Sequence, residues 1–216
     1  MSRTAPLLVA ATDDARLAAA DFDARLETLL AAGCPAVWLR SRSLGARELL
    51  ARAHVARSRC DDHGAALWVG ERADVAMLAG ADHLQLPERG LSVAGARRAA
   101  GPGVSIGRSV HSPAAARAAA REGADLLVAG AVFASRSHAD REPAGLGLLA
   151  DVRAVLAAEG RADLPLIAIG GLTPARTAGA LEAGADGVAA IRALWEAEDP
   201  AAAVRAFLAA LRRAGG

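Results

Sequence analysis

The stretch Pro165–Ile191, PLIAIGGLTPARTAGALEAGADGVAAI, is the part of the sequence that decides the fold. Its pattern predicts a strand at Leu166–Ile169, a turn at Gly170-Gly171, a helix opened by Thr173-Pro174 and a second strand at Val188–Ile191. Two short apolar strands joined by a helix are typical of neighbouring parallel strands. Each strand ends in backbone that a ligand can approach, so the stretch indicates a phosphate-binding turn on an α/β fold.

The same alternation of short apolar segments and helical segments covers the whole chain. The apolar segments predict strands buried on both faces of a parallel sheet, at Pro6–Ala11, Ala36–Arg40, Ala65–Val69, His83–Leu86, Val104–Gly107, Leu126–Val132, Leu166–Ile169 and Val188–Ile191. Helices are predicted at Arg16–Ala31, Leu44–Arg59, Ala73–Ala79, Val93–Ala100, Pro113–Arg121, Gly145–Ala158, Pro174–Ala183 and Pro200–Arg213. Because no linker divides these pairs, we expect a single (β/α)8 TIM barrel, one domain over residues 1–216, rather than a doubly wound sheet.

A short Gly-Ala-Asp repeat supports the barrel. It occurs at Gly80-Ala81-Asp82, Gly123-Ala124-Asp125 and Gly184-Ala185-Asp186, with Gly33-Cys34-Pro35 as a divergent copy. Glycine suits the left-handed position after a helix, and the aspartate can accept backbone hydrogen bonds in the turn. The repeats are therefore predicted at the helix-to-strand side of the barrel, away from the chemistry.

Composition excludes several classes of protein. The 216 residues carry a net charge of +1, which argues against a nucleic-acid partner. No apolar run is long enough to cross a membrane or to form a signal peptide, so a cytoplasmic protein is expected. Two cysteines make no disulfide framework, and no cysteine–histidine pair has metal-ligand spacing. The chain contains no lysine, which excludes a Schiff-base aldolase.

The carboxyl ends of the predicted strands are rich in polar residues, and that edge of a barrel carries its active site. Arginines lie near several of these ends, which suggests a small anionic ligand on a chain of nearly neutral charge. The turns after the seventh and eighth strands are the usual phosphate position. We predict that Gly170, Gly171, Ile191 and Arg192 bind phosphate there.

Several motifs together resemble the thiamine phosphate synthase / TenI superfamily over essentially the whole chain. They occur in this order: Thr12-Asp13-Asp14, Leu39-Arg40, Arg72-Ala73-Asp74, Leu84-Gln85-Leu86-Pro87, Ile106–Ser112, Gly130–Phe133, Ile167–Pro174 and Gly184–Val188. The segments LQLP, IGRSVHS and IGGLTP look closer to the TenI-like thiazole tautomerase branch. The resemblance implies a thiazole phosphate ligand, with the substrate-binding residues Trp38, Arg40, Arg42, Arg72, Gln85, Ser109 and Ser135.

A thiazole tautomerase, an isomerase that acts by acid/base proton transfer, is therefore the favoured function. The family base is a histidine at the end of the sixth strand, where this chain has Ala131. The candidates to replace it are His138, His111 and Glu71, with no metal and no cofactor required. No nucleic-acid or membrane partner is expected, and the oligomeric state is left open, a homo-oligomer included.

The sequence leaves two alternative functions open and disfavours a third. One is thiamine phosphate synthase, a transferase that uses Mg²⁺ to join a pyrimidine pyrophosphate to a thiazole phosphate. This chain departs from the synthase pattern at Trp38, at Gly70-Glu71 and in the lysine missing after the sixth strand. The second is a non-catalytic regulator that binds thiazole phosphate, suggested by Ala131. A phosphoribosyl isomerase is disfavoured because the first strand ends in Thr12-Asp13 without a catalytic cysteine.

Overall fold

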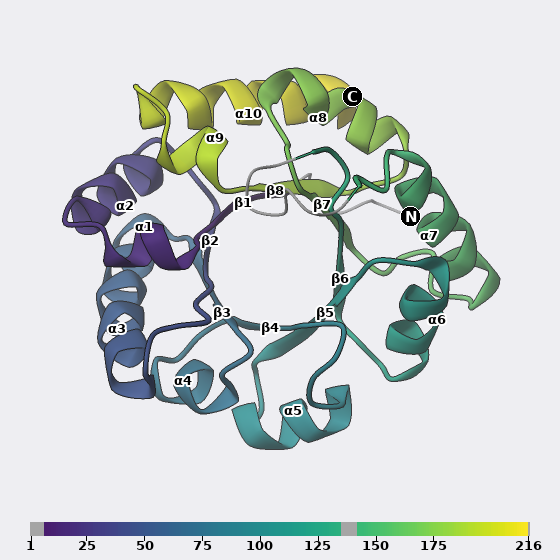
Figure 1. Cartoon of the computed structure of the whole chain (residues 1–216), viewed down its shortest axis with the longest axis horizontal. Helices are drawn as coiled ribbons and strands as arrows, with labels where there is room; N and C mark the ends of the chain where they lie inside the picture. The colour runs from purple at the N-terminus through teal and green to yellow at the C-terminus, as the bar shows by residue number, and fades with distance from the viewer. Residues whose placement is uncertain (1–6, 135–141, 216) are drawn as a thin grey trace.

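The computed structural model describes residues 7–134 and 142–215. In this part of the chain, eight parallel strands pair in chain order, and β1 pairs with β8 to close a barrel. The strands are β1 (Leu7–Ala11), β2 (Ala36–Leu39), β3 (Ala66–Gly70), β4 (His83–Leu86), β5 (Ser105–Val110), β6 (Leu126–Ala129), β7 (Leu166–Ile169) and β8 (Gly187–Ala190). Helices surround the ring of strands (Figure 1), which confirms the predicted TIM barrel.

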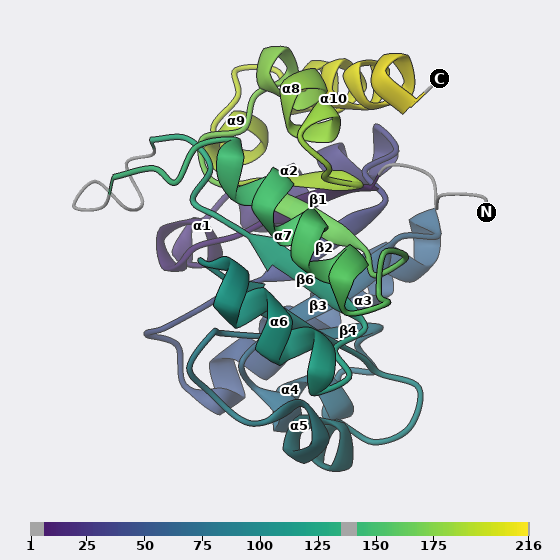
Figure 2. The ribbon, with the colours of Figure 1, turned by 90° about the vertical axis from the view of Figure 1, so that its right-hand side faces the viewer.

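The helices follow the predicted positions with two exceptions. They are α1 (Asp14–Ala18), α2 (Phe22–Ala31), α3 (Ala46–His63), α4 (Ala73–Leu78), α5 (Val93–Ala100), α6 (Pro113–Arg121), α7 (Gly147–Ala158), α8 (Pro174–Glu182), α9 (Arg192–Trp195) and α10 (Pro200–Gly215). Figure 2 shows α6 and α7 lying against the outer face of the barrel.

The single helix predicted at Arg16–Ala31 is wrong, because the chain leaves helical geometry between α1 and α2. Ala19 is extended, with φ −69° and ψ 139°. The side chain of Asp21 then accepts hydrogen bonds from Arg16 and Arg25. Both arginines also donate to the carbonyl of Trp195 at the end of α9, so contacts distant in sequence accompany the break.

The short helix α9 was not predicted, and aromatic stacking holds it in place. Trp195 is fully buried, and its ring stacks on that of Phe22 at the start of α2, with centroids 5.5 Å apart. Such stacking contributes roughly 0.5–1.5 kcal/mol beyond the burial of apolar area. The helix is only four residues long, so its own sequence carries no helical period to recognise.

Two strand ends differ from the predicted bounds in ways that shape the site. β5 continues to Val110, which brings Ser109 into the strand. β6 ends at Ala129, because the chain then turns toward β7. There the Val132 N–H donates to the Ile169 carbonyl over 2.9 Å.

Apolar side chains fill two separate layers. The larger cluster lies between the strands and the helices and includes Phe22, Leu39 and Phe207. A smaller cluster fills the inside of the barrel and includes Trp38 and Trp68. Strands covered on both faces explain why their sequences are nearly continuous in apolar residues.

The three Gly-Ala-Asp triplets perform one structural task at the amino ends of the strands. Asp82 accepts from the Leu67 N–H, Asp125 from the Ile106 N–H and Asp186 from the Leu166 N–H, over 2.7–2.9 Å. Each aspartate also pairs with an arginine of a preceding helix: Arg57, Arg97 and Arg153. The repeat therefore secures strand starts at the end of the barrel away from the pocket described below.

Cys34 and Cys60 are both free and buried. Burial raises the pKa of each thiol to about 12, so both remain protonated at neutral pH. They are packing residues rather than nucleophiles. Within the described ranges, no helix has the length and apolar character needed to cross a membrane.

Candidate active site

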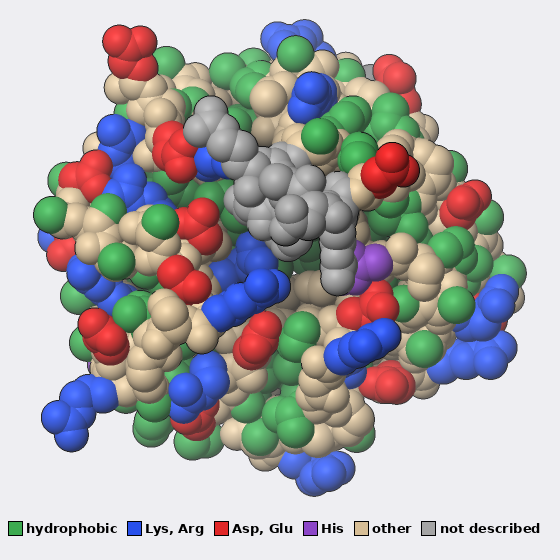
Figure 3. Space-filling model, in the orientation of Figure 1, with side chains coloured by type: hydrophobic (Ala, Val, Ile, Leu, Met, Phe, Trp, Pro, Cys, Tyr) green, Lys and Arg blue, Asp and Glu red, His purple; other side chains and the backbone are tan. Residues whose placement is uncertain are grey.

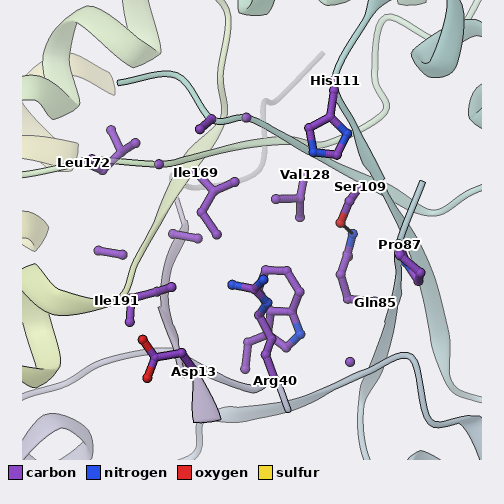
Figure 4. A pocket seen from close by; sticks show the side chains of 18 of the residues that line it. Asp13, Arg40, Gln85, Pro87, Ser109, His111, Val128, Ile169, Leu172 and Ile191 are labelled. Carbon is purple, nitrogen blue, oxygen red and sulfur yellow. Dashed lines mark hydrogen bonds between the residues drawn. The ribbon is translucent and has the colours of Figure 1, made fainter. Parts of the chain in front are cut away.

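A cavity of about 440 Å³ opens at the carboxyl ends of the strands. Arginine and carboxylate side chains lie close to one another along the visible edge of the hollow on this face (Figure 3). Figure 4 shows Arg40 reaching into the middle of the cavity, with Val128 and Ile169 on the opposite wall. The cavity therefore combines an apolar interior with a charged rim, which suits a small ligand that has a ring and an anionic group.

Arg40 and Trp38 form the floor of this cavity. Alternate residues of a strand face the same way, so the end of β2 sends both side chains inward. The Arg40 guanidinium carbon lies 4.9 Å from the centre of the Trp38 ring. Trp38 is 4% exposed, and its indole N–H has no hydrogen-bond acceptor within residues 7–134 and 142–215.

Arg40 is fixed through its backbone, and its side chain makes no ion pair in the described part of the chain. Its backbone N–H donates to the hydroxyl of Thr12 over 2.8 Å, while its guanidinium forms no ion pair with any described residue. Burial, followed by the positive charge of Arg42, lowers the pKa of Arg40 from its usual value. An unpaired guanidinium inside a cavity is a ready site for an anion.

Carboxylates surround this guanidinium, and they differ in what they can still bind. Asp14 accepts hydrogen bonds from the Ser41 hydroxyl and the Arg42 N–H, over 2.5 and 2.9 Å. The Ser41 hydrogen bond is the main reason that the pKa of Asp14 is lowered. Asp14 therefore serves to order the turn after β2. Asp13 caps α1 by accepting from the Arg16 N–H.

Glu71 lines the cavity from a strained position. It is the only non-glycine residue with positive φ in the described part of the chain, at 62°, and its backbone N–H donates to the Gln85 carbonyl. Residues held in this region cluster at functional sites. Its neighbour Gly70 leaves the floor open, because a Cβ there would lie 3.3 Å from the Trp38 indole nitrogen.

His111 and Glu88 make a hydrogen-bonded pair at the rim. The Glu88 carboxylate accepts from both the backbone N–H and the ring Nδ1 of His111, each over 2.8 Å. Burial acts to raise the pKa of Glu88, but the bonds from His111 outweigh it and hold that pKa below its usual value. With Nδ1 donating, Nε2 of His111 is left to accept or exchange a proton.

The turn after β7 is a close contact that only glycine permits. Gly170 and Gly171 have φ of 103° and 62°, and a Cβ on Gly170 would lie 2.7 Å from Cα and Cβ of Ala131. The backbone N–H groups of Gly171 and Ala193 have no acceptor in the described part of the chain. Together with the Arg192 side chain, which also lines the cavity, they offer donors to a phosphate.

Most of the predicted site residues lie together in the cavity. Its lining includes Trp38, Arg40, Arg42, Glu71, Gln85, Ser109, His111, Gly170, Gly171, Ile191 and Arg192. Arg72 does not line it and is paired with Asp74 instead, at 2.5 Å. Ser135 and His138 lie outside the described residues. The cavity is also lined by three residues that were not predicted for the site, Asp13, Glu88 and Glu142. Glu88 directly follows the LQLP motif, which contains the predicted residue Gln85.

The position after β6 where the resemblance to the tautomerase branch implies a basic residue lies in the cavity wall. Ala131 lines it and presents only a methyl group. Arg108, another arginine of the predicted rim, instead donates to the carbonyls of Pro87 and Leu91 and pairs with Glu122. Among the described residues, the arginines that line the cavity are Arg40, Arg42 and Arg192, and these could pair with an anionic ligand.

Comparisons with known proteins point to one family. The model of the family described as thiamine monophosphate synthase matches residues 7–194. A thiamine-phosphate synthase of Methanoculleus marisnigri is 43% identical over 91% of this chain and 85% of its own length. The thiamine biosynthesis bifunctional protein ThiM/ThiE of Symbiobacterium thermophilum is 43% identical over 88% of this chain and 39% of its own. The solved structure of thiamine phosphate pyrophosphorylase from Pyrococcus furiosus superimposes with a TM-score of 0.84 at 28% identity, covering 97% of each chain.

Proposed function

Because the chain belongs to the thiamine monophosphate synthase family, we propose that it is a thiamine-phosphate synthase. It would join a pyrimidine bearing a pyrophosphate to a thiazole bearing a phosphate. The family model and the relative from Methanoculleus marisnigri both carry the name of a synthase, and this favours the transferase over the tautomerase that the motifs suggested. The TenI-like assignment also lacks support at its base position, since Ala131 cannot transfer a proton.

One observation carries the proposal: an unpaired arginine shares the cavity with carboxylates. Arg40 attracts an anion, whereas Glu71 and Glu88 would repel the same anion. A divalent cation bound at these carboxylates would resolve this conflict by neutralising part of the negative charge. Such a site would suit a substrate that carries a pyrophosphate.

The residues present fit Mg²⁺, which usually binds through one or two carboxylates together with substrate phosphates. Glu71 and Glu88 would hold the ion. The described residues contain no cluster of three or more potential metal ligands, so the substrate phosphates would have to complete the site. When bound, Mg²⁺ neutralises charge on the departing pyrophosphate.

The chain's own residues would supply orientation and charge. Arg40 and Arg42 bind the pyrophosphate, while the Gly170-Gly171 turn and Arg192 hold the thiazole phosphate on the other side of β1. In the reaction, the lone pair of the thiazole ring nitrogen forms a C–N bond to the pyrimidine methylene carbon. The C–O bond to pyrophosphate breaks, and pyrophosphate departs with the bonding electrons. The apolar wall formed by Val128 and Ile169 keeps the reacting rings away from water.

The test is a reaction with purified chain, the pyrimidine pyrophosphate, the thiazole phosphate and Mg²⁺. Pyrophosphate and thiamine phosphate should form in equal amounts, and only when all four components are present. No release at high enzyme concentration would rule the synthase out. Turnover of a carboxylated thiazole phosphate without the pyrimidine substrate would instead support the tautomerase, and binding without any turnover would support the regulator.

A further inference from the structure

A chain of hydrogen bonds runs from the inside of the barrel to the cavity. Nδ1 of His83 lies 3.0 Å from the Ser105 hydroxyl, and its Nε2 lies 2.8 Å from Oε1 of Gln85. The amide nitrogen of Gln85 then donates to the hydroxyl of Ser109 over 3.2 Å. Figure 4 shows this last bond at the cavity wall. His83 and Gln85 are 3% and 1% exposed, so water cannot easily replace these bonds.

The chain of bonds has a direction. An amide oxygen only accepts, so Nε2 of His83 must carry the hydrogen, and Nδ1 must accept from Ser105. Burial lowers the pKa of His83 to about 4, which keeps the ring neutral with one donor and one acceptor. Each group therefore donates to the next in the order Ser105, His83, Gln85, Ser109.

Packing around the bonds favours this arrangement. A Cβ on Gly107 would overlap both Oε1 of Gln85 and Nε2 of His83, so the hydrogen bond occupies the space of the missing side chain. On another side, the Trp68 ring lies 4.1 Å from the His83 ring, centre to centre. The imidazole is thus held in place before any ligand binds.

The direction decides what Ser109 can offer to a ligand. Its oxygen already accepts from Gln85, and its own hydrogen has no acceptor among the described residues. We propose that this series of hydrogen bonds makes the Ser109 hydroxyl a fixed donor into the cavity. The substrate group at Ser109 is then a hydrogen-bond acceptor, such as a ring nitrogen or an oxygen. His83 and Gln85 are then positioning residues. The proposal rests on the proposed function only for the identity of the substrate that Ser109 contacts.

The first experiment needs no substrate. In the full chain labelled with ¹⁵N-histidine, NMR at pH 7 should show His83 as the neutral Nε2–H tautomer. Its signal is assigned by its loss in His83→Gln. An Nδ1–H tautomer would reverse the direction of the hydrogen bonds, and a charged ring would interrupt them. Either result would overturn the proposal, whatever the protein binds.

The second experiment reverses the last bond and measures catalysis. In Gln85→Glu, the carboxylate can only accept, so Ser109 must turn its hydrogen back toward residue 85. We expect kcat/KM to fall about tenfold, through loss of the bond to substrate. The new negative charge could lower it as well, so the same change is made in Ser109→Ala. In the Ser109→Ala protein, Gln85→Glu should lower kcat/KM clearly less than it does in the wild type. An equal loss of kcat/KM in both proteins would refute the donor role of Ser109.

Variants at His83 add a control for simple loss of structure. The amide of His83→Gln can donate to Gln85 as the imidazole did, whereas His83→Leu cannot. The glutamine variant should recover most of the kcat/KM that the leucine variant loses, at matched unfolding midpoints. Equal losses in the two variants would contradict the positioning role. A wild-type protein that forms no thiamine phosphate would instead refute the proposed function. The tautomer measurement would still decide the direction of the hydrogen bonds.

Discussion

The guanidinium of Arg40 lies over the face of Trp38, 4.9 Å from the centre of the ring, and none of the described carboxylates around it lies within ion-pair distance. The indole takes the place that a counter-ion would occupy and attracts the cation through its π electrons. The arginine is therefore oriented without being neutralised. This is the property that an anion site needs.

Arg40→Gln should raise the KM for the pyrimidine pyrophosphate about 100-fold, because a charge-assisted bond is lost inside the cavity. Arg40→Lys should raise it about tenfold, since lysine keeps the charge but not the planar fork. Steady-state kinetics with each substrate varied in turn measure both effects. Arg212→Gln, an exposed arginine on α10, is the control and should match the wild type. Equal KM values in all four proteins would remove Arg40 from the site.

Arg192→Gln should weaken the other anchor and leave the first intact. The KM for the thiazole phosphate should rise roughly 10- to 100-fold, while that for the pyrimidine pyrophosphate changes little. The Arg192 side chain forms no ion pair with a described residue, so its removal leaves no buried carboxylate unpaired. A rise in the KM of the pyrimidine substrate alone would mean that the two anchors have been assigned the wrong way round.

Gly170→Ala should destabilise the protein by roughly 3 kcal/mol, from the strained φ of 103° and the collision with Ala131. Gly147→Ala is the matched control, because a Cβ there meets nothing within 4 Å. The control should be neutral or up to about 1 kcal/mol more stable. Urea unfolding of the three proteins gives the comparison. Equal stability of the two variants would show that the turn after β7 can move aside.

Acid should destabilise the protein partly through His83. Its pKa is lowered to about 4 in the folded chain, whereas the ordinary value is 6.5. Its contribution to stability is therefore fully present above pH 6.5 and is lost as the pH falls toward 4, because the unfolded chain binds the proton first. The loss amounts to about 3 kcal/mol. His83→Gln should show a correspondingly flatter fall in unfolding free energy between pH 7.5 and 4.5; an unchanged slope would place the acid sensitivity elsewhere.

Much of the cavity could be anticipated from where each strand ends. Trp38 and Arg40 stand two residues apart at the end of β2, and the Gly170-Gly171 pair follows β7 directly. Both features are local: strand alternation predicts that the two side chains face the same way, and the resemblance to the family implies that they bind substrate. The resemblance implied the same role for Arg72, but Arg72 turns to Asp74, because a carboxylate two residues away competes for its side chain. Nothing local in the sequence announces that competition.

The sequence by itself determined the barrel, because apolar runs, helical spacing and Gly-Ala-Asp turns are each written within a few neighbouring residues. It also placed the glycine turn, the predicted phosphate site, between β7 and α8. Only the tertiary structure decided which side chains meet: Gln85 with Ser109, Glu88 with His111, and Phe22 with Trp195. These partners lie 23 to 173 residues apart in the chain. Their contact depends on the register between strands and on the packing of helices, and these arise when the barrel closes.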